Sequence, residues 1–333
     1  MLLLFNDIIT EAPDFENNDL VGFPINAILD WPMGTPAGFR VFVDPRVNQQ
    51  FKNMFDSWSE FLKSDRSTYV LSSDDNGWFG PSASAAMPDF VETFKCNPDA
   101  PHYGFKSWDD FFTREFRDGV RPVDEFPGQD NDAIINSACE STVYHLAHDI
   151  KLRDRFWLKE QPYSLIDMFN HDPLTEKFVG GTIYQAFLSA TSYHRWHSPV
   201  NGKVVKIVHI PGTYYAESPE MGFNQPGGPD PAAPNDSQAF ITSIAARALI
   251  FIEANNPKIG LMAFLAVGMA EVSTCQVTVA HDQPVKKGEQ LGMFHFGGST
   301  HCLIFRPETK VTFDPDYSNG AKVRLNAAIA TVS

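Results

Sequence analysis

The sequence contains few cysteines, and they are widely separated. Four occur in 333 residues, with no CxxC pair: Cys96, Cys139, Cys275 and Cys302. This spacing excludes the dense disulfide framework of small secreted domains and the paired thiols of common zinc and redox motifs. We therefore expect reduced thiols and a cytoplasmic location.

Basic residues are also scarce. Lysine and arginine number 26 against 41 aspartates and glutamates, which gives a formal net charge of -15 and a sequence pI near 5.0. Nucleic acid and anionic membranes both attract clustered Lys and Arg, and no basic run occurs here. The composition therefore argues against nucleic-acid binding and against stable membrane association.

Long apolar runs are absent as well. The longest, Ile259 to Ala270, is well short of the roughly 20 residues that a membrane-spanning helix needs. The opening MLLLFNDIITEAP has no basic region and no long apolar core, and Asp7 and Glu11 lie within it. From this pattern we expect neither a signal peptide nor a membrane anchor, and a soluble protein.

Two common catalytic patterns are missing. The nucleophile-elbow pattern GxSxG does not occur at Ser299, where the residues run GGSTH, and there is no HExxH zinc motif. His194 and His197 form an HxxH pair, but no third ligand accompanies them, so we predict no metal site. A triad of Ser299 with a histidine and a distant carboxylate stays open, because such triads are defined by geometry.

The composition is otherwise that of a globular protein, with 43% hydrophobic residues and 28 phenylalanines. The first part of the chain predicts helices. Apolar residues recur at helical spacing over 51–62, behind Asp44 and Pro45, an N-cap residue followed by proline at the first helical position. Ser107 with Asp110 three residues later predicts a second helix start.

From Gly180 onward the sequence predicts strands, because β-branched and aromatic runs alternate with turn residues. The runs 246–254 and 259–268 are joined by the turn residues Asn255-Asn256-Pro257 and predict a hairpin. Stretches rich in Gly, Pro, Ser and Asp predict loops at 72–84 and 218–238.

These elements predict an α+β fold. We expect an acidic helical N-terminal region over 1–125, followed by a β-rich catalytic body over 126–333. Homo-oligomers are common among soluble proteins, so a homo-oligomer is one expected assembly.

The stretch FHFGGSTHCLIF, residues 294–305, interrupts a strand-like apolar pattern with two glycines. Gly297 and Gly298 fit a bulge or tight turn, because glycine reaches positive φ without steric cost. A chemical role for Ser299 is the other interpretation.

Three stretches together decide in favour of chemistry. SWDDFFTREFRDGVRPV (107–123), YHRWHSPVNGKV (193–204) and KKGEQLGMFHFGGST (286–300) resemble, in pattern and order, the phosphatidylserine decarboxylase family of pyruvoyl enzymes. The nearer likeness is to soluble fungal members that decarboxylate free L-tryptophan, and it extends over nearly the whole chain. It includes the stretch SACES (137–141).

The resemblance implies that the peptide bond between Gly298 and Ser299 cuts itself. Attack of the serine hydroxyl on the preceding carbonyl forms an ester, and elimination and hydrolysis then leave a pyruvoyl group, the expected cofactor, at residue 299. The products would be a large chain, 1–298, and a small chain, 299–333. A reacting hydroxyl beside its target carbonyl is already in proximity, and no ordinary side chain can serve as the electron sink that decarboxylation needs.

The resemblance also implies roles for the other site residues. A serine needs a base, and that role falls to His197, oriented by Glu140, where many phosphatidylserine decarboxylases have aspartate. His194, expected with His197 in a loop between two strands, would reprotonate the substrate carbon after CO2 leaves. The turn at 286–288 is expected to be exposed and without a functional role.

For the substrate we expect a free aromatic L-amino acid, with L-tryptophan yielding tryptamine and CO2, and phenylalanine or tyrosine as alternatives. Phosphatidylserine is a further alternative that the acidic composition disfavours. Two rival interpretations stay open, a non-cleaving binding module of the same fold and a serine or zinc hydrolase that uses the same residues.

Overall fold

The computed structural model describes residues 2–16, 24–128, 130–153, 163–218, 236–271, 274–296 and 299–333. The α-helices are α1 (Leu2–Ile8), α2 (Pro24–Met33), α3 (Pro36–Phe42), α4 (Pro45–Leu62), α5 (Pro81–Ala86), α6 (Phe90–Thr93), α7 (Trp108–Phe112), α8 (Leu165–Met168) and α10 (Gln238–Ile241). The strands are β1 (Ile134–Asn136), β2 (Ser141–His148), β3 (Thr182–Leu188), β4 (Arg195–His197), β5 (Gly202–Ile210), β6 (Arg247–Ala254), β7 (Leu261–Gly268), β8 (Thr274–Val277), β9 (Pro284–Val285), β10 (Gln290–His295), β11 (Ser299–Phe305), β12 (Val311–Phe313), β13 (Lys322–Val323) and β14 (Ala328–Val332). The predicted α+β class is confirmed.

The predicted helix starts are confirmed by their caps. The Asp44 side chain accepts a hydrogen bond from the Arg46 backbone N–H (2.8 Å), and Pro45 opens α4. At α7, the Ser107 hydroxyl accepts from the Asp110 backbone N–H (3.1 Å). Each bond satisfies a donor that would otherwise lack a partner in the first helical turn.

The strands form three antiparallel sheets. The largest has the order β13-β2-β3-β11-β7-β6-β5-β9, and two three-stranded sheets have the orders β4-β10-β8 and β1-β14-β12. The predicted hairpin over 246–268 is confirmed, since β6 pairs antiparallel with β7. All residues of β7 and β11 are buried, because other strands flank them on both edges and packed layers cover both faces.

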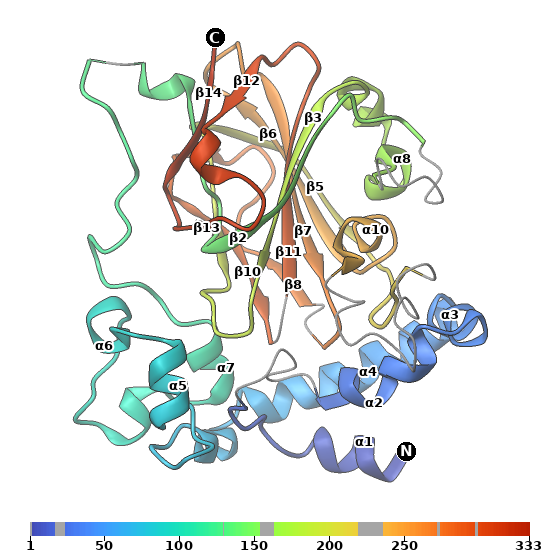
Figure 1. The fold of residues 1–333 in the computed structure, drawn as a ribbon, viewed down its shortest axis with the longest axis vertical. Helices are drawn as coiled ribbons and strands as arrows, with labels where there is room; N and C mark the ends of the chain where they lie inside the picture. Colours follow the sequence, from blue (N-terminus) through green and yellow to red (C-terminus); the bar gives the residue numbers. More distant parts are fainter. Residues whose placement is uncertain are drawn as a thin grey trace.

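Two buried clusters lie on opposite faces of the eight-stranded sheet. The smaller includes apolar residues of α8 and α10, and the larger joins α2, α4 and α7 to the sheet and to β10. Figure 1 shows α2, α4 and α7 gathered at one end of the long strands. The regions 1–125 and 126–333 therefore share one core, and the predicted boundary between them stays a prediction.

Three predicted loops need comment. The loop expected at 72–84 ends earlier, because α5 begins at Pro81 with proline at its first position. The expected loop around the HxxH pair contains the short strand β4, which pairs with β10. The loop predicted at 218–238 falls mostly outside the described residues. Among the described residues, no helix combines the length and apolar character needed to cross a bilayer.

Candidate active site

Ser299 begins β11 and lies between two other strands. Its backbone pairs with Leu188 of β3 and with Gly268 of β7, and its side chain is fully buried. No described residue forms a hydrogen bond with its Oγ. Because a buried polar atom without such a bond costs free energy, this hydroxyl is a candidate for a chemical role. The predicted cleavage residue Gly298 lies outside the described residues.

Ser299 and His301 share one face of β11. Side chains alternate along a strand, and Leu303 on the same face belongs to the larger buried cluster. The His301 ring lies 5.9 Å from that of Phe264, and burial lowers the pKa of His301 to about 3. The ring is therefore neutral at pH 7. Its spacing of two residues from Ser299 is the one signal in the sequence for its place beside the site.

The backbone is strained shortly before the predicted cleavage bond. Phe296 has a φ of 54°, in the left-handed region that bulky residues rarely adopt. Such a conformation costs about 1–2 kcal/mol. The Phe296 ring is enclosed edge-on by Trp58 and Trp108, with centroid distances of 4.5 and 4.9 Å. Tight packing of this kind is what keeps a strained residue in place.

His197 lies on β4 with both ring nitrogens in contact with oxygen atoms. Nδ1 is 2.7 Å from the Gly288 carbonyl oxygen, and Nε2 is 2.9 Å from the Tyr193 hydroxyl. A carbonyl only accepts, so Nδ1 carries the proton and Nε2 accepts from Tyr193. Burial lowers the pKa of His197 to about 4. The ring is therefore neutral at pH 7 and fixed in one tautomer.

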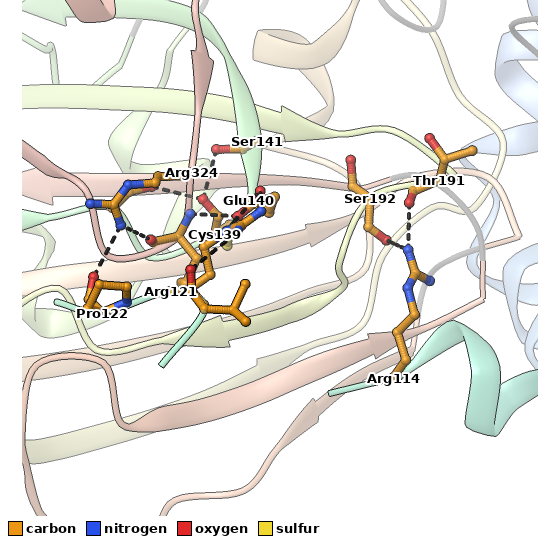
Figure 2. A network of polar contacts seen from close by, with 12 residues as sticks. Arg114, Arg121, Pro122, Cys139, Glu140, Ser141, Thr191, Ser192 and Arg324 are labelled. Carbon is orange, nitrogen blue, oxygen red and sulfur yellow. Dashed lines mark hydrogen bonds and ion pairs between the residues drawn. The ribbon is translucent and has the colours of Figure 1, made fainter. Parts of the chain in front are cut away.

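Glu140 has a different partner from the predicted one. Its carboxylate pairs with Arg121, at 2.7 Å from Nη2 and 3.0 Å from Nε, and accepts the Leu325 backbone N–H at 2.7 Å. Figure 2 shows this network, in which the Glu140 and Arg121 side chains point toward one another. The predicted orientation of His197 by Glu140 is therefore corrected to orientation by the Gly288 carbonyl.

The turn at 286–288 is exposed only in part, with Lys286 at the surface and Lys287 and Gly288 half-buried. The Lys287 ammonium donates to the carbonyl oxygens of Asn131 and Ile134. Burial lowers the pKa of Lys287 to about 8. Since Gly288 has a φ of 75°, this turn has a conformation that favours glycine. The anchored turn presents the carbonyl that His197 contacts.

His194 has surroundings different from those of His197. It is fully buried, its backbone carbonyl accepts the Phe294 N–H at 2.9 Å, and its ring stacks on Phe112 at 4.0 Å. Along an extended strand, His194 and Trp196 lie on one side and His197 on the other. The two histidines predicted to have separate tasks are thus placed in separate environments.

A short segment, residues 108–114, contacts both the HxxH stretch and the chain before Ser299. We call it the platform segment. The buried Arg114 guanidinium donates to the carbonyl oxygens of Thr191 (2.6 Å) and Ser192 (3.2 Å), as Figure 2 shows. Burial lowers the pKa of Arg114 to about 9, and the group remains charged at pH 7. The platform segment therefore fixes the turn that leads to the two histidines.

The platform segment also forms a side-chain hydrogen bond to β10. Asp109 Oδ1 is 2.8 Å from His295 Nδ1, and His295 Nε2 is 2.5 Å from Gln276 Oε1. The Asp109 and His295 side chains are 12% and 10% exposed. They are 186 residues apart in the chain, so no local pattern in the sequence relates them.

A cavity of about 820 Å³ lies between α4 and the ends of β5, β6 and β8. Its walls include Phe55, Tyr214, Ile244 and Ala246. The Ala246 carbonyl accepts the N–H of the strand residue that pairs with Ser299. The cavity wall is therefore about two strand spacings, or roughly 10 Å, from Ser299. Its volume is in the range that binds small organic molecules.

Comparisons with known proteins identify the family of this chain. The family model described as phosphatidylserine decarboxylase matches residues 108–331, and a second model with essentially the same description matches residues 1–87. The chain is 45% identical to the decarboxylase iboD of Amanita muscaria over 323 residues, 93% of this chain and 91% of the relative.

Two further relatives have lower sequence identity to this chain. The L-tryptophan decarboxylase of Psilocybe cubensis is 41% identical over 345 residues, which cover 99% of this chain and 77% of that enzyme. The phosphatidylserine decarboxylase proenzyme of Fusobacterium nucleatum is 30% identical over 261 residues, which cover 76% of this chain and 79% of the relative. This chain therefore belongs to the phosphatidylserine decarboxylase family and is a decarboxylase, a carboxy-lyase.

Proposed function

We propose that this chain is a pyruvoyl-dependent decarboxylase of a free aromatic L-amino acid, and that it converts L-tryptophan to tryptamine and CO2. The observation that carries the proposal is the buried Ser299 hydroxyl, which bonds to no described residue and begins a central strand directly after Gly298. A nucleophile that must attack its neighbouring carbonyl needs such a position.

Self-cleavage proceeds through an ester and conserves all atoms. The Ser299 hydroxyl loses its proton to a base, and its Oγ adds to the Gly298 carbonyl carbon. The C–N bond then breaks, the freed nitrogen of residue 299 takes up the proton as an amine, and an ester forms. Loss of the Cα proton of residue 299 to a base breaks the Cβ–O bond, which frees the Gly298 carboxylate and leaves dehydroalanine. One water then adds and gives the pyruvoyl group and ammonia.

His197 is the proposed base for cleavage. Two observations support it: its ring is neutral at pH 7, and the Gly288 carbonyl fixes its Nδ1–H, so that the Nε2 lone pair can take a proton. The Tyr193 hydroxyl, which now donates to Nε2, is the group through which that proton would pass.

Ser299 fits the place of a pyruvoyl group, because its side chain is enclosed and its Oγ has no described partner that the conversion would disrupt. The group supplies the electron sink that decarboxylation requires. His194 is proposed to return a proton to the substrate Cα after CO2 leaves. Its stacking on Phe112 holds the ring in place, and burial keeps bulk water from competing for the proton.

A free aromatic amino acid is the substrate that the observations support best. Two relatives that match nearly the whole chain, from Psilocybe cubensis and Psilocybe cyanescens, are L-tryptophan decarboxylases. The cavity near the site has mixed walls, in which the aromatic rings of Phe55 and Tyr214 lie with charged residues such as Asp56 and Arg247. The net charge of -15 disfavours an anionic lipid surface.

The test is a substrate panel with purified protein. Release of CO2 and the amine products are measured for L-tryptophan, L-phenylalanine, L-tyrosine, non-aromatic amino acids and phosphatidylserine vesicles, with Ser299→Ala as the control. We expect the highest kcat/KM for L-tryptophan and no activity in the variant. A higher kcat/KM for a non-aromatic amino acid or for phosphatidylserine would overturn the substrate, and an active Ser299→Ala chain would overturn the mechanism.

A further inference from the structure

A buried hydrogen bond between Asp109 and His295 lies where β10 ends, four residues before Ser299. His295 is the last residue of β10 and pairs through its backbone with Thr274 of β8. The next residue is Phe296, whose φ is 54°. Any force that holds the His295 side chain therefore acts directly on the strained part of the chain.

The His295 side chain is held at both ring nitrogens. The two oxygens of the Asp109 carboxylate are 2.8 and 3.2 Å from Nδ1, and the Gln276 amide oxygen is 2.5 Å from Nε2. A carboxylate only accepts, so Nδ1 carries a proton. Hydrogen bonds to a charged group in a largely buried site are shorter and stronger than those between neutral groups. The ring thus has one fixed orientation.

The next residue is held from the same helix. The Phe296 ring packs edge-on against Trp108, and Trp108 precedes Asp109 in α7. Two adjacent residues of α7 therefore hold the two adjacent residues that lead to the cleavage bond. Trp58 of α4 closes the other side of the Phe296 ring at 4.5 Å. A left-handed conformation at a phenylalanine persists only where its surroundings impose it.

We propose that Asp109 and His295 are positioning residues that set the rate of self-cleavage by holding the strained backbone before Gly298. This inference rests on the proposed cleavage between Gly298 and Ser299. Asp109 acts through His295 and touches neither the reacting hydroxyl nor the substrate. The pair is needed for the cleavage that forms the active site. Once the chain is cut, removal of the pair should affect substrate turnover much less.

The experiment compares Asp109→Asn and His295→Gln with wild type and with Asp110→Asn. Asp110 is a matched control, because it is the adjacent acid on α7 and its carboxylate, among the described residues, accepts a hydrogen bond from the Lys106 backbone N–H alone. Each chain is made by cell-free synthesis, synthesis is stopped, and loss of the 333-residue chain is followed on denaturing gels. We expect at least tenfold slower cleavage for Asp109→Asn and His295→Gln, and less than a twofold change for Asp110→Asn.

Three further readouts separate positioning from loss of fold. Melting temperatures are measured for all variants, and Asp109→Glu, which keeps the charge, should recover part of the lost rate. After cleavage has gone to completion, kcat and KM for L-tryptophan should lie within threefold of wild type. Wild-type cleavage rates in Asp109→Asn and His295→Gln would overturn the inference. It would also be overturned if cleavage were slow and kcat of the fully cleaved variants fell by the same factor as the cleavage rate. A wild-type chain that never cuts would overturn the proposed function as well.

Discussion

The rate of self-cleavage is expected to stay constant between pH 8 and pH 6, although the proposed base is a histidine. In this proposal the neutral form of His197 accepts the proton, so the rate follows the neutral fraction of this ring. The pKa of His197 is lowered to about 4, chiefly by burial; the hydrogen bond to the Gly288 carbonyl opposes this, the nearby Arg195 lowers the pKa and Glu115 raises it. The acid limb of the profile therefore lies well below the usual range of histidine.

The expected change in cleavage rate with pH follows from the pKa of His197. With a pKa of about 4, roughly 99% of His197 is neutral at pH 6. With an ordinary pKa near 6.5, only about a quarter would be neutral at that pH. The account thus predicts a change in rate of a few per cent at most between pH 8 and pH 6, where a solvated histidine would give a fall of about fourfold.

The assay uses cell-free chains that are stopped after synthesis and shifted to buffers from pH 4 to pH 8. Loss of the full-length chain gives the rate, and chains returned to pH 7.5 show whether the acid effect is reversible. Tyr193→Phe serves as the matched variant, because it removes the hydroxyl that donates to Nε2. Loss of that bond, worth about 1 kcal/mol, should raise the pKa by less than one unit. A wild-type acid limb near pH 6.5 would refute this account of His197.

Three other predictions test single contacts. Glu140→Gln should lower the free energy of unfolding, measured in urea, by about 1–3 kcal/mol, because the partly buried Arg121 loses its charged partner. The same variant should leave the acid limb of the cleavage rate profile unchanged. A shifted acid limb would mean that Glu140 orients His197 after all. Gly288→Ala should slow cleavage several-fold, because the φ of 75° disfavours alanine and the added methyl would come within 2.8 Å of a neighbouring side chain. An unchanged rate would mean that the Gly288 carbonyl does not orient His197. Burial raises the pKa of Glu271 to about 7. Between about pH 4.5 and pH 7 the folded state therefore binds more protons than the unfolded state, and the free energy of unfolding should fall by about 3 kcal/mol as the pH rises through that window. Glu271→Gln should remove this component, and equal pH slopes of the melting temperature in both chains would contradict it.

Features that depend on neighbouring residues could be predicted from the sequence. The cap at Asp44, the cap at Ser107 and the β6–β7 hairpin each involve residues within a few positions of one another. Capping and turn chemistry act over that range, so the local sequence determines them.

Contacts between distant segments could not be predicted in the same way. Glu140 was expected to face His197 because of the family likeness, but packing brings Arg121 and the Leu325 N–H to its carboxylate. The Glu271 carboxylate accepts the backbone N–H groups of Ile25 and Asn26 at the start of α2, about 245 residues away. Such partners depend on how the helical region docks on the sheet, and no periodic pattern in the sequence encodes that docking.

The central claim is that the chain cuts itself before Ser299 and converts this residue to a pyruvoyl group. The most direct test is the intact mass of freshly purified protein under denaturing conditions. The account predicts two fragments, 1–298 and 299–333, with the small fragment lighter by one ammonia than a peptide that begins with serine. A single full-length mass would contradict it, and two fragments with an unmodified serine would mean that the bond breaks without forming the cofactor.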